Sequence, residues 1–137
     1  MTVFSGGNNG SNDLNTSEFV SLAQGAVAGP TLSFAMSFHC MVKFNSSTAM
    51  IIGGQQNGTN SEKCWFVNFA TGFIKEGNSL NVDRRLMSCE KIIKDSENII
   101  IVVAGGKDLT GASLDTIEIF NSALGHWTLG FRWEVIS

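Results

Sequence analysis

Three short apolar segments of this chain each end in a pair of adjacent glycines, and this pattern constrains the fold more than any other feature. The pairs are Gly6-Gly7, Gly53-Gly54 and Gly105-Gly106, and their first glycines are 47 and then 52 residues apart. The segment before the last pair, residues 98–104, is rich in the β-branched residues that favour strands. A strand that stops at two glycines and recurs at a nearly constant interval predicts an array of one β-structured unit.

The residues that follow each glycine pair repeat as well. A further glycine lies 18 or 19 residues after each pair, and an apolar residue follows it two positions later, at Val27, Ile74 and Trp127. A strand-like segment precedes each of these glycines. A unit of roughly 40–50 residues with about four short strands is typical of the blades of a β-propeller.

The repeated unit resembles the kelch repeat, in which an apolar strand ends in Gly-Gly and a tryptophan follows about twenty residues later. The third unit fits best, with Gly105, Gly106, Trp127 and an arginine, Arg85, three residues before Ser88. The chain departs from the kelch pattern because it has no tyrosine. It also departs at the tryptophan and arginine places of the earlier units, which hold Val27, Ile74 and Met36.

The resemblance implies an all-β fold of antiparallel, four-stranded, kelch-like propeller blades. We expect a partial first blade at 1–34, a second blade at 35–83, a third at 84–130 and a tail at 131–137. Propellers close with about 4–8 blades, so fewer than three make an incomplete propeller. We therefore expect a fragment of a longer protein or, as the alternative, self-association through open blade faces.

The local pattern predicts strands of about 4–7 residues and no helix longer than one turn. Alternating apolar and polar residues predict one continuous strand over 37–44. Residues 55–62 are polar and are expected to form a loop. The glycine pairs themselves are expected to be structural, because a phosphate-binding loop would be followed by a helix and here another strand follows.

The three cysteines do not indicate a metal site, because no Cys-x-x-Cys spacing occurs. Cys40 and Cys89 hold matching places in consecutive units, and His39 holds the place of Ser88. We expect three buried, unpaired thiols rather than a disulfide. His39 is expected to form hydrogen bonds on a strand, and His126 to lie in a turn, so that neither binds a metal.

The composition and charge of the chain limit the classes of partner that it is expected to bind. The net charge is −3 and no basic run occurs, which argues against nucleic acid. No apolar run approaches the roughly 20 residues that a membrane helix needs, so a membrane partner is not expected. Nothing near Met1 resembles a signal peptide, which favours the cytoplasm and leaves secretion open.

Two classes of function remain, and the first is a scaffold whose blade-connecting loops bind a protein or peptide. The alternative is part of a propeller enzyme whose catalytic residues lie mostly outside this chain. The kelch-like copper oxidases use tyrosines, which this chain lacks. We therefore expect no enzyme activity, cofactor or metal. The expected partner-binding residues lie on the loops, with a structural role as the alternative for Arg85 and also for Arg84: Arg84, Arg85, Asp108, Gln56 and Asn57.

Overall fold

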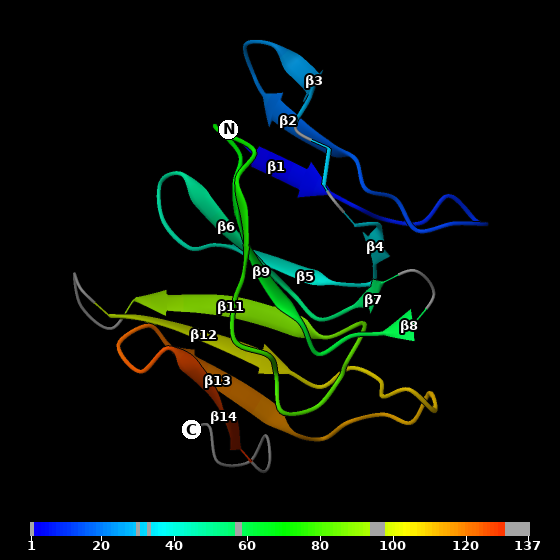
Figure 1. The fold of residues 1–137 in the computed structure, drawn as a ribbon, viewed down its shortest axis with the longest axis vertical. Coiled ribbons are helices and arrows are strands. Elements are labelled where there is room, and N and C mark those ends of the chain that lie inside the picture. The colour runs from blue at the N-terminus through cyan, green and yellow to red at the C-terminus, as the bar shows by residue number, and fades with distance from the viewer. Residues whose placement is uncertain (1, 30, 33, 57–58, 94–97, 131–137) are drawn as a thin grey trace.

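The regular structure of the chain consists of antiparallel β-strands (Figure 1). The computed structural model describes residues 2–29, 31–32, 34–56, 59–93 and 98–130. In this part of the chain there is no helix, and hence none long and apolar enough to span a membrane. The all-β prediction is confirmed, although the strands run from 2 to 6 residues and some are shorter than expected. The expected tail at 131–137 lies outside the described residues.

The N-terminal sheet has three strands in the order β1-β2-β3. They are β1 (Thr2–Ser5), β2 (Ser17–Ser21) and β3 (Gly25–Ala28). The middle strand β2 pairs with both neighbours, so β1 and β3 are the two edges of this sheet.

The middle sheet is a four-stranded meander in the order β5-β6-β9-β10. Its strands are β5 (Cys40–Lys43), β6 (Thr48–Ile52), β9 (Cys64–Asn68) and β10 (Ile74–Glu76). Four of the five residues of β6 are buried, as expected for a strand covered on both faces.

The C-terminal sheet repeats this meander in the order β11-β12-β13-β14. Its strands are β11 (Ser88–Ile93), β12 (Ile99–Ala104), β13 (Ile117–Asn121) and β14 (His126–Gly130). His126 pairs with Asn121 and thus begins a strand, so its expected place in a turn was wrong by one residue.

A small three-stranded sheet, in the order β4-β7-β8, joins the N-terminal and middle units. It consists of β4 (Met36–Ser37), β7 (Gln55–Gln56) and β8 (Thr59–Asn60), so the expected loop at 55–62 contains two short strands. The expected continuous strand at 37–44 is divided, because Phe38 has φ 56° and lies in the left-handed region. Leu86 has φ 57° at the corresponding point before the next sheet.

The backbone contacts of the glycine pairs fix how the units correspond. The N–H of Gly7 donates to the carbonyl of Met36 at 2.7 Å, and the N–H of Gly54 donates to the carbonyl of Arg84 at 2.8 Å. Met36 therefore corresponds to Arg84. The sequence comparison instead matched Met36 with Arg85, and was wrong by one residue.

The same one-residue offset between the units explains a disulfide that was not predicted from the sequence. Cys40 corresponds to Ser88, and His39 to Met87, because Cys40 and Ser88 each pair with the residue just before a glycine pair. Successive strand residues point to opposite faces, so an offset of one residue turns Cys40 and Cys89 toward each other between stacked sheets. They form a disulfide with Cα atoms 6.1 Å apart, and the prediction of unpaired thiols was wrong for both.

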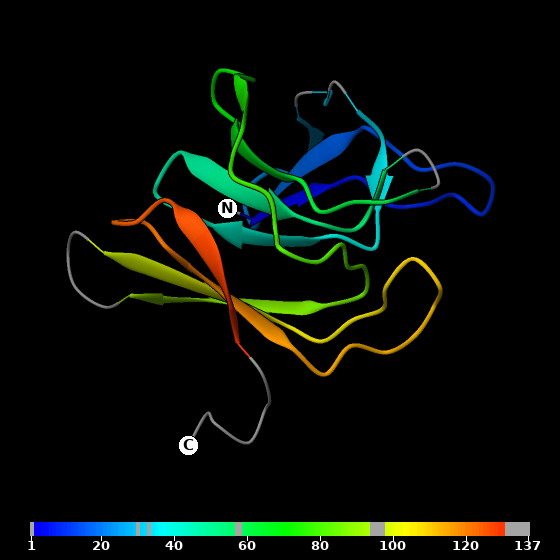
Figure 2. The same cartoon turned by 60° about the horizontal axis from the view of Figure 1, so that its bottom comes forward.

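The core has two layers, one on each face of the middle sheet, and Figure 2 shows the three main sheets stacked in chain order. The layer toward the C-terminal sheet includes Met50, Ile101, Trp127 and the unpaired thiol of Cys64, whose expected burial is confirmed. The layer toward the N-terminal sheet is built on buried residues of the middle unit and of the connection that precedes it, against which Val3 and Phe19 of the N-terminal sheet pack: Leu32, Met36, Ala49, Ile51, Val67 and Phe69.

Candidate partner-binding face

The loops that follow the three glycine pairs emerge at one end of the stack, on the right in Figures 1 and 2. We call this end the glycine-pair face and define it by residues 8–16, 55–56, 59–63 and 107–116. The turn at 44–48, which joins β5 and β6 at the other end, lies at the left in Figure 1, and residues 69–70 line the same pocket as this turn. Three separate units thus contribute polar loops to one surface.

The glycine pairs place these loops by close backbone packing. All six glycines have positive φ, between 59° and 112°, a conformation that other residues adopt only with strain. A Cβ atom built on Gly54 would lie 2.6 Å from Cβ of His39 and 2.7 Å from the carbonyl oxygen of Ser37. A Cβ on Gly106 would lie 2.5 Å from the carbonyl oxygen of Arg85. Gly54 and Gly106 therefore let their loops leave the strand against the segment that leads into the first strand of the same sheet.

A chain of polar side chains crosses the glycine-pair face between units. Asp13, in the first loop, accepts hydrogen bonds from the hydroxyl of Ser37 at 2.5 Å and from Nε2 of Gln55 at 3.3 Å. The side chain of Gln55 accepts in turn from Nη1 of Arg85 at 3.3 Å. Asp13 and Arg85 carry opposite charges, and the amide of Gln55 bridges them.

The third loop joins this chain through its backbone. Arg85 and Lys107 exchange backbone hydrogen bonds of 3.0 and 2.8 Å, and Nδ2 of Asn60 donates to the carbonyl of Lys107 at 3.3 Å. Nζ of Lys107 donates to the carbonyl of Gly111 at 3.3 Å. All three glycine-pair loops are thereby held at fixed positions relative to one another.

Arg84 does not lie on this surface, and its expected role as an exposed partner-binding anchor is wrong. Its side chain is fully buried and pairs with the carboxylate of Glu118, which is equally buried, at 3.0 Å. It also donates to the carbonyls of Gly105 and Thr116. Glu118 accepts further bonds from Asn81, so this ion pair fastens the connection between units to the C-terminal sheet.

The remaining predicted binding residues fall on or beside the glycine-pair face. Arg85 is half-buried and bonded to Gln55, so the structure gives it the structural contact that was its alternative role. Asp108 is partly exposed, and its carboxylate accepts hydrogen bonds from Thr110 and Ala112 within its own loop. The hydrogen bond from the Thr110 side chain is the main cause that lowers the pKa of Asp108. Gln56 lies on β7, and Asn57 lies outside the described residues.

The titratable residues do not assemble a catalytic or metal-binding group in the described part of the chain. No cluster there has three or more His, Cys, Asp or Glu side chains that would hold a metal ion. His39 lies beneath the glycine pairs, and burial lowers its pKa, an effect that a hydrogen bond to the backbone of Ser5 partly opposes. Burial raises the pKa of the Cys64 thiol to about 12, so this thiol is a poor nucleophile.

The structural roles of two residues at this end of the molecule, Asp13 and Glu118, were not predicted from the sequence. Asp13 looked like one of several scattered carboxylates, and its contacts with Ser37 and Gln55 join segments 24 and 42 residues away. Glu118 sits in an apolar strand segment, and a charged residue within such a segment is the signal that a buried partner exists. The identity of that partner, Arg84, depends on tertiary packing.

A scan against protein-family models finds no match to this chain, and a search of curated proteins finds no similar sequence.

Proposed function

We propose that this chain is part of a kelch-like β-propeller that acts as a protein-binding scaffold through its glycine-pair face. Two successive four-stranded antiparallel meanders stack on each other, as propeller blades do, which supports this proposal. The glycine pair ends the second strand of each meander, as in the kelch repeat. The kelch family supplies the function by analogy, because kelch propellers commonly bind proteins.

The observation that carries the proposed function is the convergence of three polar loops on one end of an apolar stack. Binding residues are disproportionately found on loops that a rigid scaffold holds in place. Here the contacts among Asp13, Gln55, Arg85 and Lys107 hold the loops, so the surface is ordered before a partner arrives. An ordered surface loses less conformational entropy on binding than a mobile one.

The charges on this face favour a protein partner over a polyanion. Acidic and basic side chains are mixed there rather than segregated, so no basic stripe exists in the described loops. Such a surface complements another mixed protein surface, whereas nucleic acid binds clustered cations. The charged side chains of the face are Asp13, Glu62, Lys63, Lys107, Asp108 and Asp115.

In this proposal the outer face of the C-terminal sheet is covered by a further blade or by another copy of the chain. That face carries Ile100, Val102 and Ile119, which are partly exposed, and Ile92, which is 51% exposed. The corresponding side of the middle sheet, which bears Met50 and Ile52, is covered by the C-terminal sheet. An apolar face of this kind is typical of an interface between repeats.

Site-specific photo-crosslinking in cells that express the chain tests the proposed function. A photoreactive residue is placed at Gln56 or Thr110 on the glycine-pair face, and at Ser46 or Thr71 in the turns at the opposite end. We expect one protein to be captured from both positions on the glycine-pair face and from neither turn. The charge reversal Glu62→Lys, at an exposed carboxylate of this face, should weaken that capture without lowering the melting temperature. Capture from the opposite turns alone would contradict the proposal.

A further inference from the structure

In the part of the chain that the structure describes, the N-terminal sheet lacks a strand that the other two main sheets have. The strand before each of the second and third glycine pairs has a partner on both sides: β6 lies between β5 and β9, and β12 lies between β11 and β13. The equivalent strand β1 pairs only with β2, and no described strand lies along its other edge. The missing neighbour would correspond to β5 and β11.

The backbone of β1 is arranged to receive such a neighbour. The N–H of Gly6 donates to the carbonyl of Thr16 at 2.8 Å, as the N–H of Gly53 does to the carbonyl of Lys63 at 2.9 Å. Hydrogen-bonded and non-bonded pairs alternate along antiparallel strands, so the N–H and C=O groups of Val3 point away from β2. An unpaired edge of this kind is a template for another strand.

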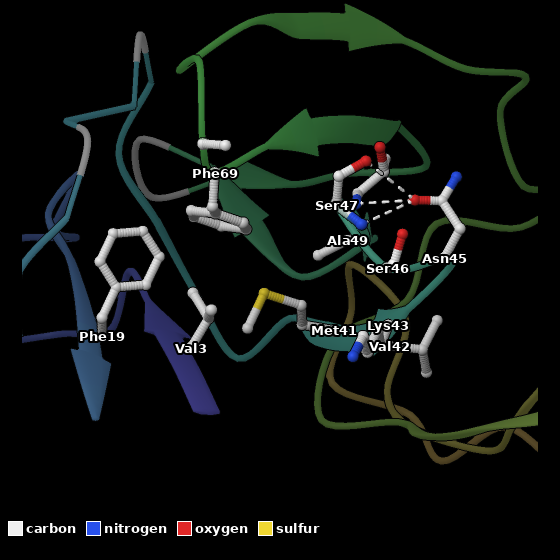
Figure 3. A pocket seen from close by; sticks show the side chains of 12 residues that line it. Val3, Phe19, Met41, Val42, Lys43, Asn45, Ser46, Ser47, Ala49 and Phe69 are labelled. Carbon is white, nitrogen blue, oxygen red and sulfur yellow. Dashed lines mark hydrogen bonds between the residues drawn. The ribbon is translucent and has the colours of Figure 1, made fainter. Parts of the chain in front are cut away.

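A cavity of about 800 Å³ lies beside this edge (Figure 3). Figure 3 shows Val3 and Phe19 of the N-terminal sheet facing Met41 and Phe69 of the middle sheet across the hollow. One of its twelve lining residues, Lys43, is charged. Four more lining residues, in the turn at 45–48, are polar. The cavity is therefore polar at that turn and apolar on the side formed by Val3, Phe19, Met41, Ala49 and Phe69.

The middle and C-terminal sheets show what fills the position that is equivalent to this cavity. There the first strands β5 and β11 lie side by side and are joined by the Cys40–Cys89 disulfide. From β5, Cys40 and Val42 point into the core toward the next sheet, as does Phe44 just beyond it. A strand beside β1 would in the same way lie next to β5 and would direct alternate side chains over Met41.

We propose that the free edge of β1 and this cavity form an acceptor site for an extended strand from another polypeptide. The strand pairs with the backbone of Val3 and places apolar side chains at alternate positions into the cavity, over Met41, Ala49 and Phe69. Backbone hydrogen bonds supply affinity, and the cavity selects the alternating side chains, as in other cases of β-strand addition. The segment from 40 to 44 of this chain has the required pattern, because Cys40, Val42 and Phe44 already fill the equivalent place one unit later.

Fluorescence anisotropy with the full chain and a labelled peptide tests this site. The peptide has the sequence of residues 37–44 with alanine in place of its cysteine. A control peptide has lysine in place of its valine and last phenylalanine, because a carboxylate could pair with Lys43 at the cavity. We expect saturable binding of the first peptide and no binding of the second, because charge does not enter the apolar side of the cavity.

Two proline variants locate the binding edge. Val3→Pro removes a backbone donor from the free edge of β1, and we expect it to weaken peptide binding about tenfold or more. Ala26→Pro is the matched control on the opposite edge: the bond from Gly29 N–H to the carbonyl of Ser17 places the N–H of Ala26 outward. This control should bind the peptide as the wild type does.

Loss of binding in both proline variants, or in neither, overturns the proposal. Sedimentation velocity identifies the competing occupant, a second copy of the chain. A stable dimer that excludes the peptide and that Val3→Pro dissociates would assign the edge to self-association and overturn the proposal. The proposal is supported if the wild-type chain binds the peptide and its sedimentation changes only by the added mass of the peptide.

Discussion

Replacing Gly54 with alanine tests whether the glycine pairs are required by close packing as well as by backbone conformation. Gly54 has φ +87°, and an alanine there costs about 1–2 kcal/mol for the left-handed conformation alone. Its Cβ would also lie 2.6 Å from Cβ and 2.7 Å from Cα of His39, and 2.7 Å from the carbonyl oxygen of Ser37. Because Cα and the carbonyl oxygen belong to the backbone, the overlap adds about 1–3 kcal/mol, as overpacking does in cores.

We therefore expect Gly54→Ala to lower the free energy of unfolding by about 2–5 kcal/mol. Gly125→Ala is the matched control, because Gly125 has φ +78° and no heavy atom within 4 Å of the added Cβ. It should cost only the conformational part, about 1–2 kcal/mol. Urea unfolding followed by circular dichroism measures both values. Equal losses in the two variants would refute the close-packing role of the glycine pairs.

Three further predictions concern buried groups. Arg84→Met leaves the carboxylate of Glu118 buried without its cationic partner, and should lower the free energy of unfolding by about 3–5 kcal/mol in urea titrations. Arg85→Met, at the partly exposed neighbour, should lower it clearly less. A thiol reagent at pH 8 should detect no cysteine in the native chain and one after denaturation without reductant, because two are bridged and burial raises the pKa of Cys64 to about 12; a reactive native thiol would contradict this. Burial lowers the pKa of His39 below its ordinary 6.5, so the unfolded chain binds the proton first and stability should fall as the pH drops below about 6.5. His39→Asn should remove that loss and His126→Asn should keep it, as urea midpoints at several pH values will show.

The strands were predictable because local patterns specify them. The β-branched segment at 98–104 corresponds to β12, which begins one residue later, at Ile99, and ends at the same residue. The strand expected over 37–44 is divided at Phe38, because this residue has a left-handed backbone conformation. An aromatic residue gives no sequence signal for positive φ, since its side chain does not favour that conformation.

The correspondence between units was harder to predict. The sequence comparison was wrong by one residue at Cys40 and Cys89, since the segments between glycine pairs differ in length and an insertion is not located by spacing alone. A shift of one residue reverses the face to which a strand residue points. The disulfide was therefore missed for the same reason that the alignment was wrong.

The candidate site was predictable at the level of loops but not of side chains. The loops that follow the glycine pairs, at 8–16 and 107–116, lie at one end of the stack, on the right in Figure 1. Arg84 and Arg85 are adjacent and chemically alike, yet one is fully buried against Glu118 and the other bridges to Gln55. Which of the two points inward depends on the packing of the connecting segment against the C-terminal sheet, and residue type alone does not specify it.

Hydrogen–deuterium exchange on the chain bound to its captured partner tests the central claim most directly. If the glycine-pair face is the binding surface, peptides that cover the loops at 8–14, 59–63 and 107–114 should gain protection on binding. The turns at 44–48, 69–73 and 121–125, at the opposite end, should exchange as they do in the free chain. Protection confined to those turns, with the glycine-pair loops unchanged, would contradict the account.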